Sequence, residues 1–147
     1  MPDSKALDQL QQKAQAAKIS DLPVSDFMSP VVLEVAPDSH IYSVVQALAV
    51  KKISGAPVVD STHKLLGVIS EFDLLLQAAT KDLADKITYT KDVITVMPTS
   101  KLSECLVILY KKKLRLIPVV DKNHKVVGLV SRLDVLHRLI TPLHKKK

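Results

Sequence analysis

The chain has 147 residues, 47% of them hydrophobic, and a formal net charge of +6 at pH 7. This length leaves room for one compact domain, or for two subdomains that share a core. No apolar run approaches the roughly 20 residues of a membrane-spanning helix, and the first residues lack the pattern of a signal peptide. We therefore expect a soluble, cytoplasmic protein without membrane insertion. The mean hydropathy of +0.17 is high for such a chain and favours an apolar face reserved for a second copy.

The charge is unevenly distributed. Residues 1–80 carry six Lys or Arg against nine Asp or Glu, whereas residues 81–147 carry fifteen against six. A basic half indicates an anionic partner: nucleotide phosphates, nucleic acid or an acidic protein. Lysines 111–113 and Arg115 nevertheless fall near an expected helix end, where cations complement the helix dipole. With two Phe, three Tyr and no Trp, a stacking platform for single-stranded nucleic acid is poorly supported.

The N-terminal segment predicts one helix and a linker. Residues 3–18 place Leu7, Leu10, Ala14 and Ala17 at helical spacing. A helix this weakly apolar needs a surface to pack on, either the domain or a partner chain. Prolines in residues 19–30 exclude a continuous helix there.

The rest of the chain is a tandem duplication. Residues 54–73 return as residues 115–134 without a gap, 61 positions later, and the same register pairs Val32 with Val93 and Val35 with Val96. An internal repeat of this length means two copies of one structural unit.

Each repeat predicts the order strand, helix, strand, strand, helix. In the first copy these are strand 31–35, helix 40–53, strand 56–59, turn 60–64, strand 65–69 and helix 70–79. In the second copy they are strand 93–96, helix 100–113, strand 117–120, turn 121–125, strand 126–130 and helix 131–140. One copy buries too little surface to stand alone, so we expect an α/β fold in which the two pack around a pseudo-twofold axis.

The informative motif is Gly-x-x-Ser-x-x-Asp, residues 67–73, with its twin at residues 128–134. A strand passes into a helix at a serine, and an acid follows three residues later. One interpretation is a capping box, in which the hydroxyl and the acid satisfy the first turn. The other is a ligand site, since helix-start N–H groups bind phosphate and a carboxylate accepts both hydroxyls of a ribose. The spacing alone leaves both interpretations open.

Together with the preceding Pro-Val-Val-Asp, this motif closely resembles the CBS domain family, named after cystathionine beta-synthase. The segment Val-Ser-Asp-Phe-Met-Ser-Pro, residues 24–30, resembles the family's lead-in. The resemblance implies an N-terminal helix and linker over residues 1–23, two CBS domains over 24–80 and 81–142, and a basic tail over 143–147. It also implies a ligand that contains adenosine, such as AMP, ADP, ATP or S-adenosylmethionine.

Carried over position by position, the resemblance implies two ligand sites. The ribose-binding acids are Asp73 and Asp134, and the phosphate-contacting hydroxyls are Ser70 and Ser131. The first site is completed by Ser29, Val32, Leu33, Ser54, Gly55, Ala56 and Pro57, and the second by Thr90, Val93, Ile94, Arg115, Leu116, Ile117, Pro118 and Arg132.

The second copy departs from the first in two ways that bear on ligands. Leu116 replaces Gly55 and narrows the second adenine slot. Arg132 replaces Glu71 after the motif serine, so a cation stands at one helix start and an anion at the other. If these side chains reach the sites, the second favours di- or triphosphates and the first tolerates a monophosphate at most.

Other reactive residues indicate no enzyme. Cys105 lies among leucines and predicts a core residue rather than a catalytic thiol. His63 and His124 share one turn position and predict surface turns rather than metal ligands. No catalytic constellation of Ser, His and Asp, no carboxylate pair and no glycine-rich phosphate loop is present.

The sequence thus favours a regulatory module without a reaction or cofactor of its own. It would bind an adenine nucleotide, dimerise, and signal to a regulated protein of unknown identity. The alternatives are a structural module, in which the repeats only dimerise and the Ser/Asp pairs are caps, and a nucleic-acid binder that uses the basic half.

Overall fold

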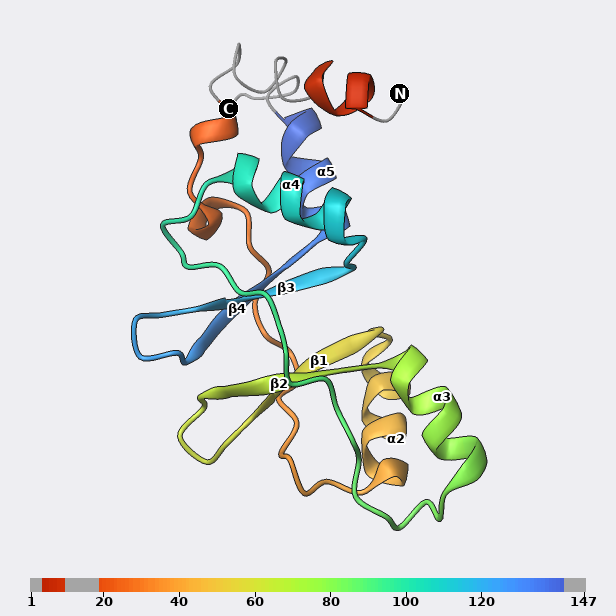
Figure 1. Ribbon diagram of the computed structural model, residues 1–147. Helices are drawn as coiled ribbons and strands as arrows, with labels where there is room; N and C mark the ends of the chain where they lie inside the picture. The colour runs from red at the N-terminus through yellow and green to blue at the C-terminus, as the bar shows by residue number, and fades with distance from the viewer. Residues whose placement is uncertain (1–3, 10–18, 142–147) are drawn as a thin grey trace. The chain divides into compact units, whose positions relative to one another are not determined.

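The computed structural model describes residues 4–9 and 19–141. Two short 3-10 helices, Ile19–Asp21 and Val24–Asp26, precede the first repeat. That repeat contains helix α2 (Ile41–Lys51), strands β1 (Gly55–Val59) and β2 (Leu65–Ser70), and helix α3 (Glu71–Thr80). The second contains helix α4 (Leu102–Lys112), strands β3 (Leu116–Val120) and β4 (Val126–Ser131), and helix α5 (Arg132–Ile140). Figure 1 shows the same element order in both repeats and confirms the predicted α/β class.

The predicted N-terminal helix is only partly described. Residues 4–9 are helical, and Leu7 is buried with 8% of its surface exposed. The predicted positions Leu10, Ala14 and Ala17 lie outside the described residues, as does the basic tail.

Each repeat has a two-stranded sheet with a helix pair packed beside it. Strands β1 and β2 are antiparallel, with Gly55 opposite Ser70 and a bulge between Val58 and Val59. Strand β3 pairs with β4. β1 is buried along its whole length, as the unbroken apolar run predicts, whereas β2 alternates between buried and half-buried positions.

The prediction of strands over residues 31–35 and 93–96 was wrong, because each segment forms only a single β-bridge. Val35 forms a parallel bridge with Val58, and Val96 forms one with Val119. The Val35 amide donates to the carbonyl of Pro57 at 3.0 Å. The next ladder bond would need an N–H from the proline itself, which has none. Pro118 stands in the same place beside Val96 and stops the second ladder for the same reason.

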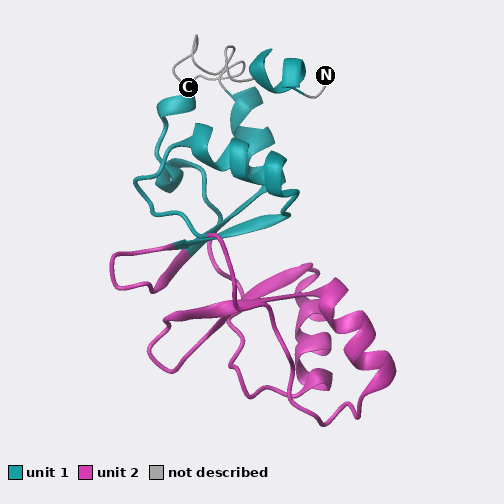
Figure 2. Cartoon of the chain, viewed as in Figure 1, with its two compact units in different colours: residues 1–29, 95–119, 128–147 teal, residues 30–94, 120–127 magenta. Residues whose placement is uncertain are grey.

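The chain divides into two compact units whose boundaries cut across the repeats (Figure 2). One unit, called unit 1, contains the residues up to Ser29, Thr95–Val119 and the residues from Gly128 onward. The other, unit 2, contains Pro30–Ile94 and Val120–Val127. Each unit therefore takes the helices of one repeat and the lead-in segment of the other.

Backbone hydrogen bonds explain this exchange of lead-in segments. In unit 1, Ser29 and Leu129 of β4 exchange two bonds of 2.8 and 2.9 Å. In unit 2, Thr90 and Val68 of β2 exchange two bonds of 2.9 Å. Ser29 and Thr90 are 61 residues apart, as are Val68 and Leu129, so both contacts follow the repeat. The segment before each repeat lies along the last strand of the other repeat.

The two motif glycines make this approach possible. A Cβ atom on Gly67 would lie 2.1 Å from the carbonyl oxygen of Thr90, and one on Gly128 would lie 2.6 Å from Sδ of Met28. Real Cβ atoms do not come this close to backbone oxygen atoms, so only glycine fits beside Thr90. The glycine of the motif is needed for the lead-in segment rather than for its own backbone angles.

The tips of the two hairpins pair within unit 2. The amide of Leu65 donates to the backbone carbonyl of His124 at 3.0 Å, and the amide of Val126 donates to the backbone carbonyl of His63 at 3.2 Å. Both histidines have a left-handed backbone conformation, with φ angles of 69° and 65°. Beneath the paired tips lies a small core of Val59, Leu65, Val120 and Val126. Larger cores occupy the rest of each unit, around Ile41 and Ile69 in unit 2 and around Leu102 and Ile117 in unit 1.

Candidate functional site

Both motif serines cap a helix, as the spacing predicts. The Asp73 amide donates to the Ser70 hydroxyl at 3.1 Å, and the Ser70 amide donates to Oδ2 of Asp73 at 3.0 Å. Ser131 and Asp134 form the same pair of bonds at the start of α5, at 3.1 and 2.8 Å. These bonds confirm that both motifs form capping boxes, and in each of them one carboxylate oxygen of the aspartate accepts a bond from the serine amide.

The second oxygen distinguishes the two repeats. In unit 1, the Ser29 hydroxyl donates to Oδ1 of Asp134 at 2.7 Å. In unit 2, Thr90 stands at the equivalent position, but no described residue donates a hydrogen bond to Oδ1 of Asp73. Asp73 thus keeps one acceptor oxygen, while both oxygens of Asp134 are occupied.

A cavity of about 340 Å³ opens beside Asp73 in unit 2. Its walls come from α3 and from the segment that follows it: Phe72, Asp73, Leu76, Gln77, Thr88, Tyr89 and Thr90. This volume lies within the range of small-molecule sites. An acceptor oxygen beside apolar and aromatic walls suits a flat, partly polar molecule with hydroxyl donors.

Gln77 holds one wall of this cavity in place. The side chain is buried, with 7% of its surface exposed. Its amide nitrogen donates to the carbonyl of Thr88 at 2.8 Å and its oxygen accepts from the Thr88 amide at 2.8 Å. Gln77 belongs to none of the sequence motifs, and the signal that could have pointed to it is a lone amide side chain inside the apolar stretch of α3.

The predicted membership of the two sites needs correction for Ser29 and Thr90. The family resemblance, carried over position by position, implied a site with Ser29 and Asp73 and another with Thr90 and Asp134. Ser29 is instead bonded to Asp134, and Thr90 lines the cavity of Asp73. The exchanged lead-in segments are the reason, because each follows the last strand of the other repeat.

Arg132 was also wrongly placed beside Asp134. Its Nε donates to the carbonyl of Leu114 at 2.7 Å and its Nη2 to that of Lys113 at 2.9 Å. Helix α4 ends there with carbonyls that have no intrahelical partner, and a guanidinium satisfies two of them at once. The predicted preference of the second site for di- or triphosphates therefore no longer holds, because it required the Arg132 side chain to reach that site.

The other predicted residues occupy several environments. Gly55, Ala56 and Pro57 are buried in β1, and Ile117 and Pro118 are buried in β3. Leu33 packs against the core of unit 2, Leu116 is half-buried, and Val32 and Ile94 are 51% and 37% exposed. Val93 is half-buried. The carbonyls of Ser54 and Arg115 accept the first amides of α3 and α5, from Glu71 and Arg132, at 2.8 and 3.2 Å.

These last bonds reduce the phosphate-binding capacity of the helix starts. In α3 the amides of Ser70, Glu71 and Asp73 already have protein acceptors. The same holds at the start of α5. An incoming phosphate would compete with bonds that are already formed, so the free carboxylate oxygen is the stronger recognition element.

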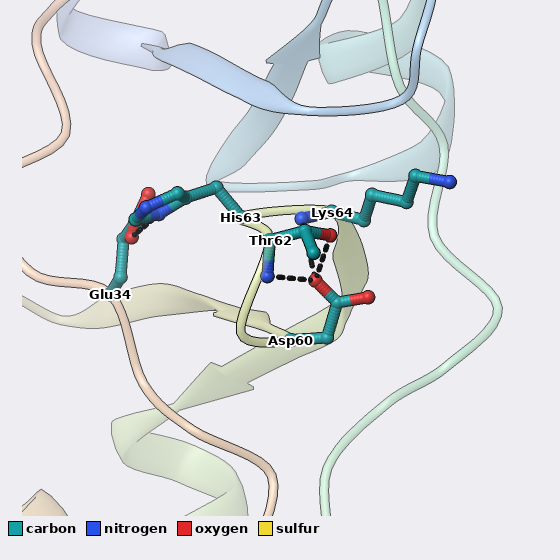
Figure 3. A network of polar contacts seen from close by, with 5 residues as sticks. All are labelled: Glu34, Asp60, Thr62, His63 and Lys64. Carbon is teal, nitrogen blue, oxygen red and sulfur yellow. Dashed lines mark hydrogen bonds and ion pairs between the residues drawn. The ribbon is translucent and has the colours of Figure 1, made fainter.

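The side chain of Asp60 stabilises the first hairpin turn through hydrogen bonds (Figure 3). Oδ1 of Asp60 accepts bonds from the amide and hydroxyl of Thr62 and from the amide of Lys64, at 2.7 to 3.0 Å. The Thr62 hydroxyl, with the two backbone N–H groups, lowers the pKa of the Asp60 carboxyl. His63 faces Glu34, with Nδ1 2.7 Å from Oε1. Among residues 4–9 and 19–141, no three His, Cys, Asp or Glu side chains gather as a metal site.

Cys105 is fully buried in the core of unit 1, as predicted. Burial raises the pKa of its thiol from 9.0 to about 12, and the neighbouring Glu104 adds to the shift. A thiol held in its neutral form is a poor nucleophile.

The family model of the CBS domain matches residues 24–79 and 82–141. The chain belongs to the CBS domain family. Two CBS domains in tandem account for the internal repeat and for the recurrence of the Gly-x-x-Ser-x-x-Asp motif. No helix in the described part of this CBS pair is long and apolar enough to cross a membrane.

Solved CBS pairs share this fold. The crystal structure of CBSX2 in complex with AMP is 30% identical, with a TM-score of 0.70, over 78% of this chain and 93% of that one. CBSX2 comes from Arabidopsis thaliana. The CBS pair of protein MJ0100, in complex with 5′-methylthioadenosine and S-adenosyl-L-methionine, is 26% identical with a TM-score of 0.70, over 78% of this chain and 93% of that one.

Relatives by sequence are longer proteins. Protein MJ1232 of Methanocaldococcus jannaschii is 34% identical over 82% of this CBS chain and 40% of its own length. The inosine-5′-monophosphate dehydrogenase of the same organism is 28% identical over 89% of this chain and 25% of its own length. The CBS pair therefore spans less than half of either relative.

Proposed function

We propose that this CBS pair is a regulatory module that binds an adenosine ligand and has no reaction of its own. The free oxygen of Asp73, beside a cavity of about 340 Å³, is the observation that carries the proposal. A carboxylate oxygen accepts hydroxyl hydrogen bonds strongly, and a ribose offers two adjacent hydroxyls. AMP, ADP, ATP and S-adenosylmethionine all present that pair.

Two comparisons support this ligand class. A CBS pair that is 30% identical was solved with AMP, and another, 26% identical, with 5′-methylthioadenosine and S-adenosyl-L-methionine. These ligands share adenosine or its 5′-thio form and differ in phosphate. Because the helix-start amides of this chain are already bonded, we propose that the ribose, more than the phosphate, anchors the ligand.

Signalling follows from where the ligand would bind. The cavity joins α3 to the lead-in segment 88–90, so a ligand there would change the contact between these two segments. We propose that a homodimer passes this change to a regulated protein. Part of the dehydrogenase of M. jannaschii matches this chain, which supports a control function beside an enzyme rather than catalysis.

Titration calorimetry with paired ligands tests the proposal. Adenosine, AMP, ATP and S-adenosylmethionine are compared with 2′,3′-dideoxyadenosine, which lacks both ribose hydroxyls. We expect micromolar binding of at least one of the first four, and about 10-fold or greater loss for the dideoxy compound, since a hydrogen bond to a charged group contributes about 1.5–3 kcal/mol. Equal binding of adenosine and its dideoxy form would remove Asp73 as the anchor.

The complete capping boxes favour one second candidate, a structural module that only dimerises. In that case none of the five compounds binds at concentrations up to about 1 mM. The same titration therefore separates the two functions.

A further inference from the structure

Gln77 ties helix α3 to the segment that forms another wall of the Asp73 cavity. Its amide nitrogen donates to the carbonyl of Thr88 at 2.8 Å and to the carbonyl of Asp73 at 3.1 Å, and its oxygen accepts from the Thr88 amide at 2.8 Å. The nitrogen and the oxygen of this buried side chain therefore both have partners. Such an amide holds its partners in one position, because breaking the bonds leaves buried polar groups unpaired.

Strand β2 fixes the same segment a second time. Thr90, two residues after Thr88, exchanges two backbone bonds of 2.9 Å with Val68. Figure 1 shows this segment passing β2 on its way from α3 to α4. Because it is held at Thr88 and at Thr90, the segment can move toward Asp73 only by breaking one of these sets of bonds. The two attachments thus keep the cavity open beside the free oxygen of Asp73.

Unit 1 lacks the glutamine attachment. Through the 61-residue repeat, Gln77 corresponds to Arg138 and Thr88 corresponds to Phe27. A guanidinium has no acceptor atom, so Arg138 cannot accept a bond from the Phe27 amide. That amide donates instead to the carbonyl of Val24 at 3.0 Å, within the lead-in segment itself.

The lead-in segment of unit 1 bonds to the motif aspartate instead. The Ser29 hydroxyl donates at 2.7 Å to Oδ1 of Asp134, the oxygen that is equivalent to the free one of Asp73. A hydroxyl of the chain itself therefore lies where the proposed function places a ribose hydroxyl. A ligand at Asp134 would first have to break this bond, which weakens its binding about 10-fold or more.

We propose that Gln77 is the positioning residue of the ligand site and that it makes unit 2 the one unit of each chain that binds the adenosine ligand. In unit 2 the amide of Gln77 holds the lead-in segment back, so that Asp73 keeps a free oxygen. In unit 1 the Ser29 hydroxyl takes the place of the ligand at Asp134. The inference rests on the proposed function and adds to it a single ligand per chain, selected by a residue outside the motif.

Titration calorimetry counts the bound ligand and locates it. Adenosine, AMP, ATP and S-adenosylmethionine are titrated into the full wild-type chain and into Asp134→Asn, whose amide oxygen can still cap helix α5. We expect the tightest of these compounds to bind at one per chain and to bind both chains equally well. Two equal sites per chain, or a loss of about 10-fold or more in Asp134→Asn, would overturn the inference and leave the proposed function in place. A wild-type chain that binds none of the four compounds would remove the proposed function, and the inference with it.

Gln77→Met tests the attachment itself, and Arg138→Met is its matched control. Methionine is as long as glutamine but leaves the amide and carbonyl of Thr88 without their partner, so α3 no longer holds the segment. We expect Gln77→Met to weaken binding of the tightest compound about 10-fold or more, and Arg138→Met, at the equivalent position of unit 1, to leave it unchanged. Thermal unfolding shows whether each variant is folded. A folded Gln77→Met chain that binds as tightly as the wild type would overturn the inference.

Gln77→Glu separates positioning from a general loss of stability. A buried carboxyl group is protonated at about pH 5 and then offers Thr88 one donor and one acceptor, as the amide does. At about pH 9 the group is ionised and has no donor. Relative to the wild type at the same pH, we expect near-normal binding at the lower pH and a loss of about 10-fold or more at the higher pH. A Gln77→Glu chain whose affinity relative to the wild type does not depend on pH would overturn the positioning role, even where Gln77→Met fails to fold.

Discussion

Replacing Asp73 with asparagine separates its two roles, because only one carboxylate oxygen serves the helix cap. The amide oxygen of asparagine can still accept the Ser70 amide, now at 3.0 Å from Oδ2, so the capping box survives. What is lost is the negative charge at the first turn of α3, which contributes about 0.3–1 kcal/mol to stability. For a chain of this length that lowers the melting temperature by at most about 4 °C.

Ligand binding responds more strongly to the same change. The ribose hydroxyls would bond to a neutral amide group instead of a carboxylate, which removes about 1.5–3 kcal/mol of binding free energy. We therefore expect Asp73→Asn to weaken AMP binding about 10- to 150-fold. Titration calorimetry and thermal unfolding on the same preparation measure both effects.

Glu104→Gln is the matched control. Glu104 holds the same third position of helix α4, where Oε1 accepts the amide of Lys101 at 2.7 Å, but the N-cap residue of that helix is Lys101 rather than a serine. We expect a similar small loss of stability and no change in AMP affinity. Unchanged AMP binding in Asp73→Asn would refute the ribose assignment, and equal losses in both variants would show a nonspecific effect.

Three further predictions concern the packing around the two motifs. Ser29→Ala removes the 2.7 Å bond to Asp134 and is expected to lower the free energy of unfolding by about 1–2 kcal/mol, whereas Thr90→Ala is expected to lower it by less than about 0.5 kcal/mol. Urea titration measures both variants, and equal losses would contradict the asymmetry of the two aspartates. Gly67→Ala places a Cβ atom 2.1 Å from a backbone oxygen, whereas in Gly128→Ala the neighbour at 2.6 Å is the flexible end of the Met28 side chain. We expect Gly67→Ala to lower the melting temperature more than Gly128→Ala, and the reverse order would refute the close approach. Burial raises the pKa of the Cys105 thiol to about 12, so the unfolded chain loses this proton at a lower pH than the folded chain does. We therefore expect the free energy of unfolding to fall as the pH rises above about 9. A thiol reagent that labels the native protein at about pH 8 would show that the side chain is not buried.

The sequence by itself predicted the repeated α/β unit and the residues that start its helices. Offset repetition identified two copies, and apolar runs beside turn residues located β1 to β4 within one residue of their observed bounds. The capping boxes at Ser70 and Ser131 also followed from spacing. These features depend on neighbours a few positions away, so local residue order is sufficient to predict them.

Only the tertiary structure decided which residues share a site. The lead-in segments exchange repeats, so Ser29 meets Asp134 across 105 positions and Thr90 meets the cavity of Asp73. Arg132 turns toward the open end of α4 instead of the motif, and Gln77 fixes a wall that no motif includes. Because β2 and β4 have similar sequences, they offer each lead-in segment nearly equal partners. Local pattern cannot distinguish these partners, because the choice depends on how the whole chain folds back on itself.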